Sequence, residues 1–191
     1  MNRQSTPFTR FWNEFRENRI AVLALSIVVL LALLALFASF VSPQNPYDLA
    51  NLSLMDSRRP PGFVGTGGYT HWLGTDPQGR DLLSAIFYGL RISIQIGLAA
   101  GFVSLSIGAA LGILAAYIGG RVENLIMRLV DLQLSFPAIL LALVIVALLG
   151  QGKVQLISAL VTAQYAYFAR TAYGAAKAER GKDYIEAAVA T

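Results

Sequence analysis

Long, nearly unbroken runs of apolar residues constrain the fold of this sequence more than any other feature. Ile20–Val41 is the first run, and at about 1.5 Å of rise per residue a helix of that length reaches roughly 33 Å. The hydrocarbon core of a bilayer is about 30 Å thick. The runs are continuous and do not alternate with polar residues, which predicts helices and not strands. We therefore expect an all-α, polytopic helical membrane protein.

Four membrane spans are expected, at Ile20–Val41, Ile92–Ile118, Leu132–Leu149 and Val154–Ala169. Arg16 and Arg19 precede the first run, as basic residues do in a cleaved signal peptide. The run is longer than the roughly 7–15 apolar residues of such a peptide, and no small-x-small cleavage site follows it. The first span is therefore interpreted as an uncleaved anchor.

The segments between these runs are polar. Ser42–Gly89 carries several prolines and a glycine-rich stretch, which predict a flexible loop. Arg121–Ser135 predicts a short polar link, with Ser135 as the cap of the third span and Pro137 in its first turn. Gly150–Lys153 is expected to form a tight turn.

The composition excludes several classes of protein. Charged residues make up 14% of the chain, well below the usual quarter of a soluble domain. The net charge of +4 comes from basic residues at the ends of apolar runs, not from a patch interleaved with aromatics, so nucleic-acid binding is not expected. With no cysteine and one histidine, His71, neither a thiol nucleophile nor a metal site is expected. These absences disfavour a membrane enzyme.

Residues 8–19 form an amphipathic pattern. Phe8, Phe11, Trp12 and Phe15 recur at helical spacing, and charged residues occupy the other side. Aromatic residues on one face and charges on the other are typical of a helix in the headgroup layer of a membrane. A helix that binds a soluble partner remains the alternative.

The second span carries a stripe of small residues at every fourth position, namely Ser104, Gly108, Gly112, Ala116 and Gly120. Such stripes let helix backbones approach closely, which membrane bundles need because lipid provides no hydrophobic drive to association. The stripe predicts helix packing, within this chain or against another membrane subunit.

The fourth span carries a polar stripe, formed by Gln155, Ser158, Thr162 and Tyr165. These positions share one helical face. A polar face inside a membrane lines either a bundle interior or a water-filled path. Both interhelical hydrogen bonding and a translocation path remain open.

The distribution of Lys and Arg predicts the orientation. With the amino terminus in the cytoplasm, ten basic residues lie inside and five outside, the latter being Arg58, Arg59, Arg80, Arg91 and Lys153. Four spans then return the chain to the cytoplasm near Arg170. The charged segment that follows is too polar for hydrocarbon and is rich in helix formers, which predicts a helix exposed at the cytoplasmic face.

Within that segment, Tyr184, Ile185, Glu186, Ala187 and Ala188 resemble the Glu-Ala-Ala loop of the permease subunits of bacterial ABC importers. The resemblance implies a coupling helix that docks on an ATP-hydrolysing subunit. An ordinary cytosolic loop is the alternative reading of the same residues. The family pattern continues with a glycine that would follow Thr191, and six spans form its longer arrangement. The resemblance thus implies a C-terminally truncated sequence that lacks two spans.

A second motif runs from His71 to Asp81, with Gly74, Thr75, Asp76, Gly79 and Arg80 between them. It resembles the signature that precedes the second span in the dipeptide and oligopeptide (OppC/DppC-like) branch of the MetI-like type I permeases. By its residues alone, the motif predicts a helix start capped by Thr75 or Asp76, with Pro77 at the first position. Catalysis by His71, Asp76 and Asp81 is disfavoured because no nucleophile accompanies them.

The resemblance implies three regions: an interfacial helix and anchor at 1–41, an extracytoplasmic loop at 42–89, and an incomplete permease core at 90–191. It implies a permease of a dipeptide or oligopeptide importer in the bacterial inner membrane that works by alternating access. The implied partners are a second permease, two ABC ATPases and an extracytoplasmic substrate-binding protein. ATP and Mg would be used by the ATPases, and the chain is expected to bind no cofactor.

Three alternatives remain open. A nickel or glutathione importer shares much of the signature. A membrane scaffold or a passive channel would need no ATPase.

The glycines at 65–68 lack the Gly-Lys-Ser/Thr continuation of a phosphate-binding loop, so no nucleotide site is expected in the chain.

Overall fold

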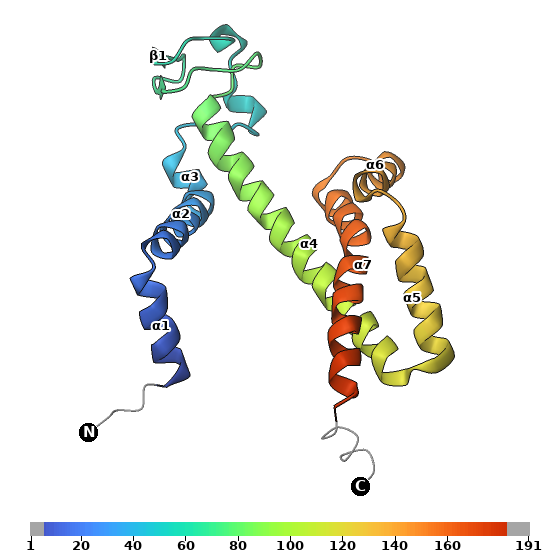
Figure 1. Ribbon diagram of the computed structural model, residues 1–191. Helices are drawn as coiled ribbons and strands as arrows, with labels where there is room; N and C mark the ends of the chain where they lie inside the picture. Colours follow the sequence, from blue (N-terminus) through green and yellow to red (C-terminus); the bar gives the residue numbers. More distant parts are fainter. Residues whose placement is uncertain (1–5, 183–191) are drawn as a thin grey trace, which may run out of the picture. The chain divides into compact units, whose positions relative to one another are not determined.

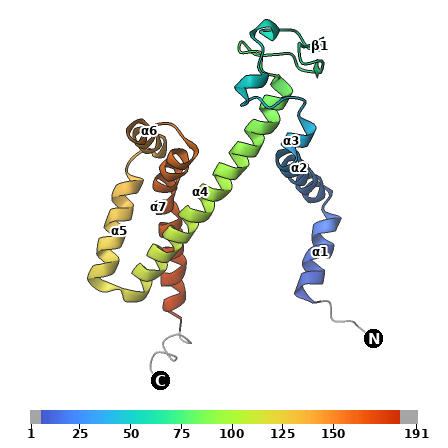
Figure 2. The ribbon, with the colours of Figure 1, turned by 180° about the vertical axis from the view of Figure 1, so that it is seen from behind.

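The computed structural model describes residues 6–182 of the 191-residue chain (Figures 1 and 2). The chain divides into two compact units, with the boundary between Ile94 and Gln95.

The first unit begins with the predicted amphipathic helix, α1 (Pro7–Glu17), followed by α2 (Arg19–Leu36) and the short α3 (Ala38–Val41). Asn18 separates α1 from α2, and its side-chain oxygen accepts hydrogen bonds from the backbone N–H groups of Ile20 and Ala21 at 3.1 and 3.2 Å. This is the capping role that asparagine favours at a helix start. The chain can therefore change direction between the amphipathic helix and the first span.

Residues 42–81 are not the flexible loop that the prolines and glycines predict. They contain the 3-10 helices η1 (Leu49–Asn51) and η2 (Leu54–Asp56), and strand β1 (Phe63–Val64) pairs antiparallel with β2 (Thr70–His71). A further bridge joins Thr75 to Asp81. Local composition suggested flexibility here, but hydrogen bonds between distant positions order the loop.

Helix α4 (Leu82–Ile118) contains the second span and starts ten residues earlier than predicted. The predicted start at Thr75 or Asp76, with Pro77 in the first turn, is wrong. Asp81 is the cap, because its carboxylate accepts the backbone N–H of Ser84 at 2.7 Å. The residues between Asp76 and Arg80 form a turn that is held by the Asp76 side chain.

The second unit continues with α5 (Gly120–Leu134), α6 (Ala138–Leu149) and α7 (Lys153–Arg180). The predicted polar link at 121–135 is therefore wrong, because α5 fills it. Gly119 and Gly120 both have positive φ, at 72° and 61°, a conformation that glycine adopts without steric cost. This pair ends α4 and lets α5 fold back. The predicted turn at 150–153 does separate α6 from α7.

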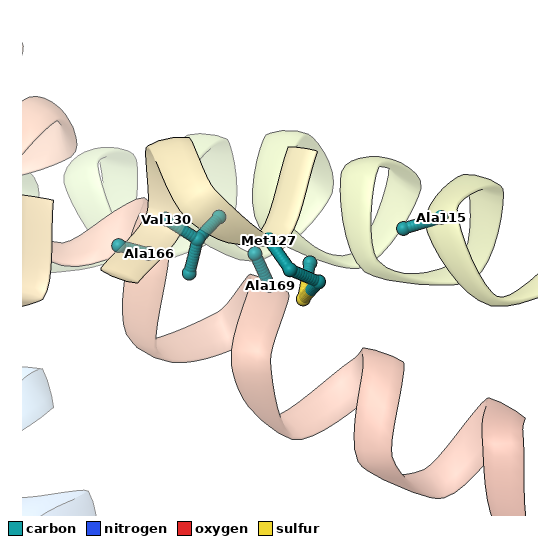
Figure 3. Close-up of a cluster of buried hydrophobic side chains, with 5 residues drawn as sticks. All are labelled: Ala115, Met127, Val130, Ala166 and Ala169. Carbon is teal, nitrogen blue, oxygen red and sulfur yellow. The ribbon is translucent and has the colours of Figure 1, made fainter. Parts of the chain in front are cut away.

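The core of the second unit lies between α4, α5 and α7 (Figure 3). Its members are small or slender side chains, namely Ala115, Met127, Val130, Ala166 and Ala169. Alanines on α4 and α7 keep these helices close together, while Met127 and Val130 of α5 fill the space beside them. The small size of the side chains sets the close spacing of the helices.

The third predicted span is broken in the structure. Helix α6 is 12 residues long, which gives roughly 18 Å of length at 1.5 Å per residue, and it is bent by 87° from α5. Ser135 does not cap it: the Ser135 hydroxyl donates to the Asp131 carbonyl at the end of α5. Pro137 precedes α6 as its N-cap. The apolar run indicated membrane contact, but the bend prevents a single straight helix.

Within residues 6–182, two helices are long and apolar enough to cross a membrane, α2 and α4. The bent pair α5–α6 raises the number to three if it counts as one span. Four spans were expected from the sequence. Helix α7 covers the predicted fourth span and has the length, but its glutamines and its charged carboxyl-terminal half keep it less apolar than α2 and α4. The helical membrane fold is as predicted.

We expect Val130→Ala to destabilise the second unit, because Val130 is 1% exposed and belongs to the buried cluster. The lost methyl groups and the remaining cavity cost about 1–2 kcal/mol. Thermal unfolding in detergent measures the effect, and Leu129→Ala, at a neighbouring residue that is 56% exposed, is the matched control. Equal melting temperatures for the two variants would contradict this view of the core.

Candidate functional site

The predicted coupling segment, Tyr184 to Ala188, lies outside the described residues. The structure describes the helix that leads into it, α7, which ends at Arg180. The site is therefore built from α7 and from the helices against which α7 packs. The signature loop before α4 is a separate candidate site in the first unit.

Helix α7 packs on the small-residue face of α4. A Cβ atom added at Gly108 would lie 2.6 Å from Phe168 Cβ, and one added at Gly112 would lie 2.7 Å from the backbone nitrogen of Tyr173. Cβ atoms essentially never come this close to atoms to which they are not bonded, so any larger residue would push the helices apart. The glycines lie where the two backbones approach most closely, the geometry that small-residue stripes allow in membrane bundles.

The other three residues of the predicted small-residue stripe differ in burial and in the helix to which they belong. Ser104 and Ala116 are buried on α4, and within the described residues the Ser104 hydroxyl has no hydrogen-bond partner. Gly120 does not belong to the same helix, because it is the first residue of α5. The close-packed part of the stripe thus runs from Ser104 to Ala116.

The polar stripe of α7 is half-buried, and its hydroxyl groups bond to their own helix. Ser158 donates to the Gln155 carbonyl at 2.8 Å, and Thr162 donates to the Ser158 carbonyl at 2.9 Å. The side-chain amide of Gln133, on α5, donates to the Thr162 carbonyl at 2.8 Å. Tyr165 packs against the apolar cluster. Among the described residues, one hydrogen bond joins the stripe to another helix, through the Thr162 backbone carbonyl, and the stripe side chains are partly accessible.

In the signature loop, His71 and Asp81 form a buried pair. Nδ1 of His71 lies 3.0 Å from Oδ1 of Asp81, and both side chains are fully buried. The backbone N–H of Asp81 donates to Gln44 Oε1 at 2.8 Å, and the backbone N–H of Gln44 donates to the Ser84 hydroxyl at 3.3 Å. These bonds fasten the start of the loop and the second strand to the first turn of α4.

A second group of hydrogen bonds joins the middle of the loop. The Asp56 carboxylate accepts the backbone N–H and the hydroxyl of Thr66 at 2.9 and 2.8 Å. The Thr75 hydroxyl donates to the Asp56 carbonyl and accepts the backbone N–H of Arg59 at 2.8 Å. Thr75 of the signature thus holds the η2 region in place. Sequence reasoning missed Gln44, Asp56, Thr66 and Ser84, because nothing local distinguishes them from other polar loop residues.

The glycines of the signature make room for the loop backbone. Gly74 and Gly79 have positive φ, at 79° and 77°. Added Cβ atoms would lie 3.1 Å from the Pro60 carbonyl carbon and 3.0 Å from the Ser53 carbonyl carbon, respectively. Both positions therefore require glycine for conformation and for space.

Asp76 and Arg80 close the turn between these glycines. Nε of Arg80 donates to Oδ2 of Asp76 at 2.7 Å, and the backbone N–H of Arg80 donates to Oδ1 at 3.0 Å. Partial burial by itself raises the pKa of Asp76, but the hydrogen bonds from Arg80 and Gln78 outweigh it and hold the pKa below its ordinary value. Asp76 therefore stays ionised at neutral pH and is no proton donor. The signature residues serve to order the loop.

The described residues contain no group of three His, Asp or Glu side chains that could hold a metal ion. Each oxygen of the Asp81 carboxylate has a protein partner, Oδ1 the His71 ring and Oδ2 the backbone N–H of Ser84. The hydrogen bonds of the signature loop hold its backbone segments in place. The small residues of the second unit let its helices pack closely.

Two family models match the chain. Residues 6–61 match the N-terminal transmembrane domain of oligopeptide transport permease C, and residues 108–191 match the binding-protein-dependent transport system inner membrane component. The first match covers α1, α2, α3 and the beginning of the loop. The second begins in α4 and includes the glycine-packed helices.

Curated relatives match over nearly the whole chain. The di/tripeptide transport system permease protein DppC of Pseudomonas aeruginosa is 37% identical over 95% of this chain. The dipeptide transport system permease protein DppC of Haemophilus influenzae is 32% identical over 94%. The glutathione transport system permease protein GsiD of Pectobacterium atrosepticum is 35% identical over 96%. The chain spans 59%, 60% and 58% of these relatives' own lengths.

We expect His71→Ala to loosen the loop, because it leaves the buried Asp81 carboxylate without its partner. Leaving a buried hydrogen-bonding group without its partner costs about 1–3 kcal/mol. Hydrogen exchange of the Gly62 and Gly65 amides, which bond to the His71 and Tyr69 carbonyls across the hairpin, measures this as faster exchange. Trp72→Ala, at a neighbouring residue that is 68% exposed, is the control. Unchanged exchange in the His71 variant would exclude a structural role for the pair.

Proposed function

Because the chain belongs to the binding-protein-dependent permeases of ABC importers, in their oligopeptide permease C branch, we propose that it forms part of the membrane path for dipeptides or oligopeptides. The observation that carries the proposal is the order of the two family matches on one chain, an N-terminal permease C domain followed by the inner membrane component. The pathway is driven by alternating access, and this chain itself hydrolyses no ATP.

The cargo is proposed from the relatives. One of them is named as a di/tripeptide permease, one as a dipeptide permease and one as a glutathione permease. Glutathione is itself a tripeptide, so both readings describe short peptide-like cargo. A glutathione importer is the second candidate, because GsiD is about as similar to this chain as the DppC proteins are. Competition between a labelled dipeptide and glutathione for uptake separates the two.

The proposed partners are a second permease, two ABC ATPases that use ATP and Mg, and an extracytoplasmic substrate-binding protein. ATP binding can drive transport only if the ATPases contact the two states of the permease differently. The segment from Tyr184 to Ala188 is the proposed place of that contact. Glu186 supplies its charge, and Ala187 and Ala188 keep one side slim enough to enter a groove on the ATPase.

The proposed orientation places the amino terminus in the cytoplasm of a bacterium and the protein in its inner membrane. Helices α2 and α4 are each long and apolar enough to cross the membrane once. Two crossings bring the chain after α4 back to the cytoplasmic side in this proposed orientation. The Arg180 side chain donates to the Ala116 carbonyl near the carboxyl end of α4 at 2.6 Å, so α7 ends on the same side. This supports a cytoplasmic coupling segment, whatever the path of α5 and α6 through the membrane. Residues 42–81 then face the extracytoplasmic side.

We expect Glu186→Ala and Ala187→Leu to uncouple ATP hydrolysis from uptake in the complete transporter. Allosteric couplings typically change an equilibrium by about 5–150-fold, so peptide uptake should fall by about tenfold. Uptake and ATPase activity are measured together in reconstituted vesicles. Ala178→Leu, on the exposed side of α7, is the control, and normal coupling in both segment variants would end the assigned role.

The polar stripe is proposed to face the translocation path. The chain has no cysteine, so single cysteines at Ser158, Thr162 and Tyr165 can be probed without background. We expect a water-soluble thiol reagent to modify all three in membranes. Cysteine at Leu148, which is 79% exposed and apolar, should be protected by lipid. Protection of all three stripe positions would mean that the stripe serves packing alone.

A further inference from the structure

Four side chains meet where α7 ends against α4 and α5. We name them the anchor cluster: Glu123 of α5, with Tyr173, Lys177 and Arg180 of α7. Tyr173 and Lys177 both donate hydrogen bonds to Oε1 of Glu123. The Lys177 ammonium also donates to the Tyr173 hydroxyl at 2.7 Å and lies 5.2 Å from the centre of its ring.

Arg180 ties the same end of α7 to α4. Its Nη1 donates to the carbonyl of Ala116 at 2.6 Å, and the last carbonyls of a helix lack partners within the helix. A cation at this end is also favoured by the helix dipole. A Cβ atom added at Gly119, in the turn after α4, would lie 3.2 Å from Nη1 of Arg180. The turn that reverses the chain thus lies directly beside the end of α7.

Apolar packing does little to hold this part of α7. Beyond Tyr173 the helix carries Gly174, Ala175, Ala176 and Ala178, and three of these four are exposed. The buried alanines of α7 end at Ala169. Hydrogen bonds to charged groups are among the stronger polar contacts, and the Glu123 side chain is only 16% exposed. The polar contacts therefore dominate the attachment of the last two turns.

We propose that the anchor cluster is a positioning site for ATPase coupling. It fixes the last turns of α7 to both α4 and α5, so that movement of the coupling segment, which begins four positions after Arg180 at Tyr184, passes to three helices together. The inference rests on the proposed importer function. Glu123 is its key member, because it accepts the bonds from both Tyr173 and Lys177.

A second link between α5 and α7 provides a comparison. Nη2 of Arg170 lies 3.1 Å from Oδ1 of Asp131, and both side chains are half exposed. This pair lies ten positions before Arg180 on α7, beside the apolar core that already holds the helices together. Its loss should leave the last turns of α7 in place. It is therefore a matched control for the loss of an ion pair between the same helices.

The test uses the complete transporter in vesicles and measures peptide imported per ATP hydrolysed. We expect Glu123→Gln to lower this ratio by about fivefold or more, the lower range of allosteric couplings, while ATP hydrolysis continues. Lys177→Gln should act in the same direction. The exchange Glu123→Lys with Lys177→Glu restores the ion pair and should recover the ratio, which a general loss of stability would not allow. Asp131→Asn should stay near the unaltered ratio.

Hydrogen exchange of the α7 amides from Tyr173 to Arg180 supplies a readout that does not depend on transport. Faster exchange in Glu123→Gln and recovery in the charge exchange support the anchor. An unchanged ratio in Glu123→Gln would overturn it whatever the exchange shows, as would an equal effect of Asp131→Asn. If the unaltered transporter shows no ATP-dependent uptake, the proposed importer function fails, and the inference fails with it. If the unaltered transporter is coupled and Glu123→Gln is too, the inference alone fails.

Discussion

The close approach of α4 and α7 at Gly108 and Gly112 is the contact on which the second unit depends. Lipid chains surround apolar side chains as favourably as other helices do, so burial of apolar surface does not drive helix association in a membrane. Helices there are held together by close van der Waals contact and by hydrogen bonds. Glycine on one helix lets the backbone of the other come within contact distance. The alanines Ala115 and Ala166 extend the same close packing of α4 and α7. Met127 and Val130 of α5 pack against the paired helices and fill the space beside them.

The loop region is stabilised in a different way. It has few buried apolar side chains, and its order comes from the buried pair of His71 and Asp81 and from Asp56 with its hydroxyl partners. A buried polar network is stable only if its members find partners. Most members do so here, through contacts that reach across some 40 positions of the sequence, as between Gln44 and Ser84. The signature residues are thus best understood as the framework of the loop.

Prediction succeeded where one local pattern dominated. The aromatic face of α1 and the apolar run of α2 are visible within a short window, and both helices formed near the expected positions. It failed at α5, where four charged residues suggested a link and a helix formed instead, because one of its faces packs Met127 and Val130 into the core. It failed again at Pro77, where the local fit to a helix start was overridden by the Asp76–Arg80 turn and the Asp81 cap.

By itself the sequence determined the membrane character of the chain, its amphipathic start and the small-residue face of α4. These follow from composition and periodicity, which act within one helix. Only the tertiary structure decided that α5 folds back, that α6 turns by 87° from α5, and that Glu123 contacts Tyr173 of α7, 50 positions away. Such contacts depend on the path of the backbone between the partners, and here that path is set by two glycines with positive φ and by how closely α4 and α7 pack.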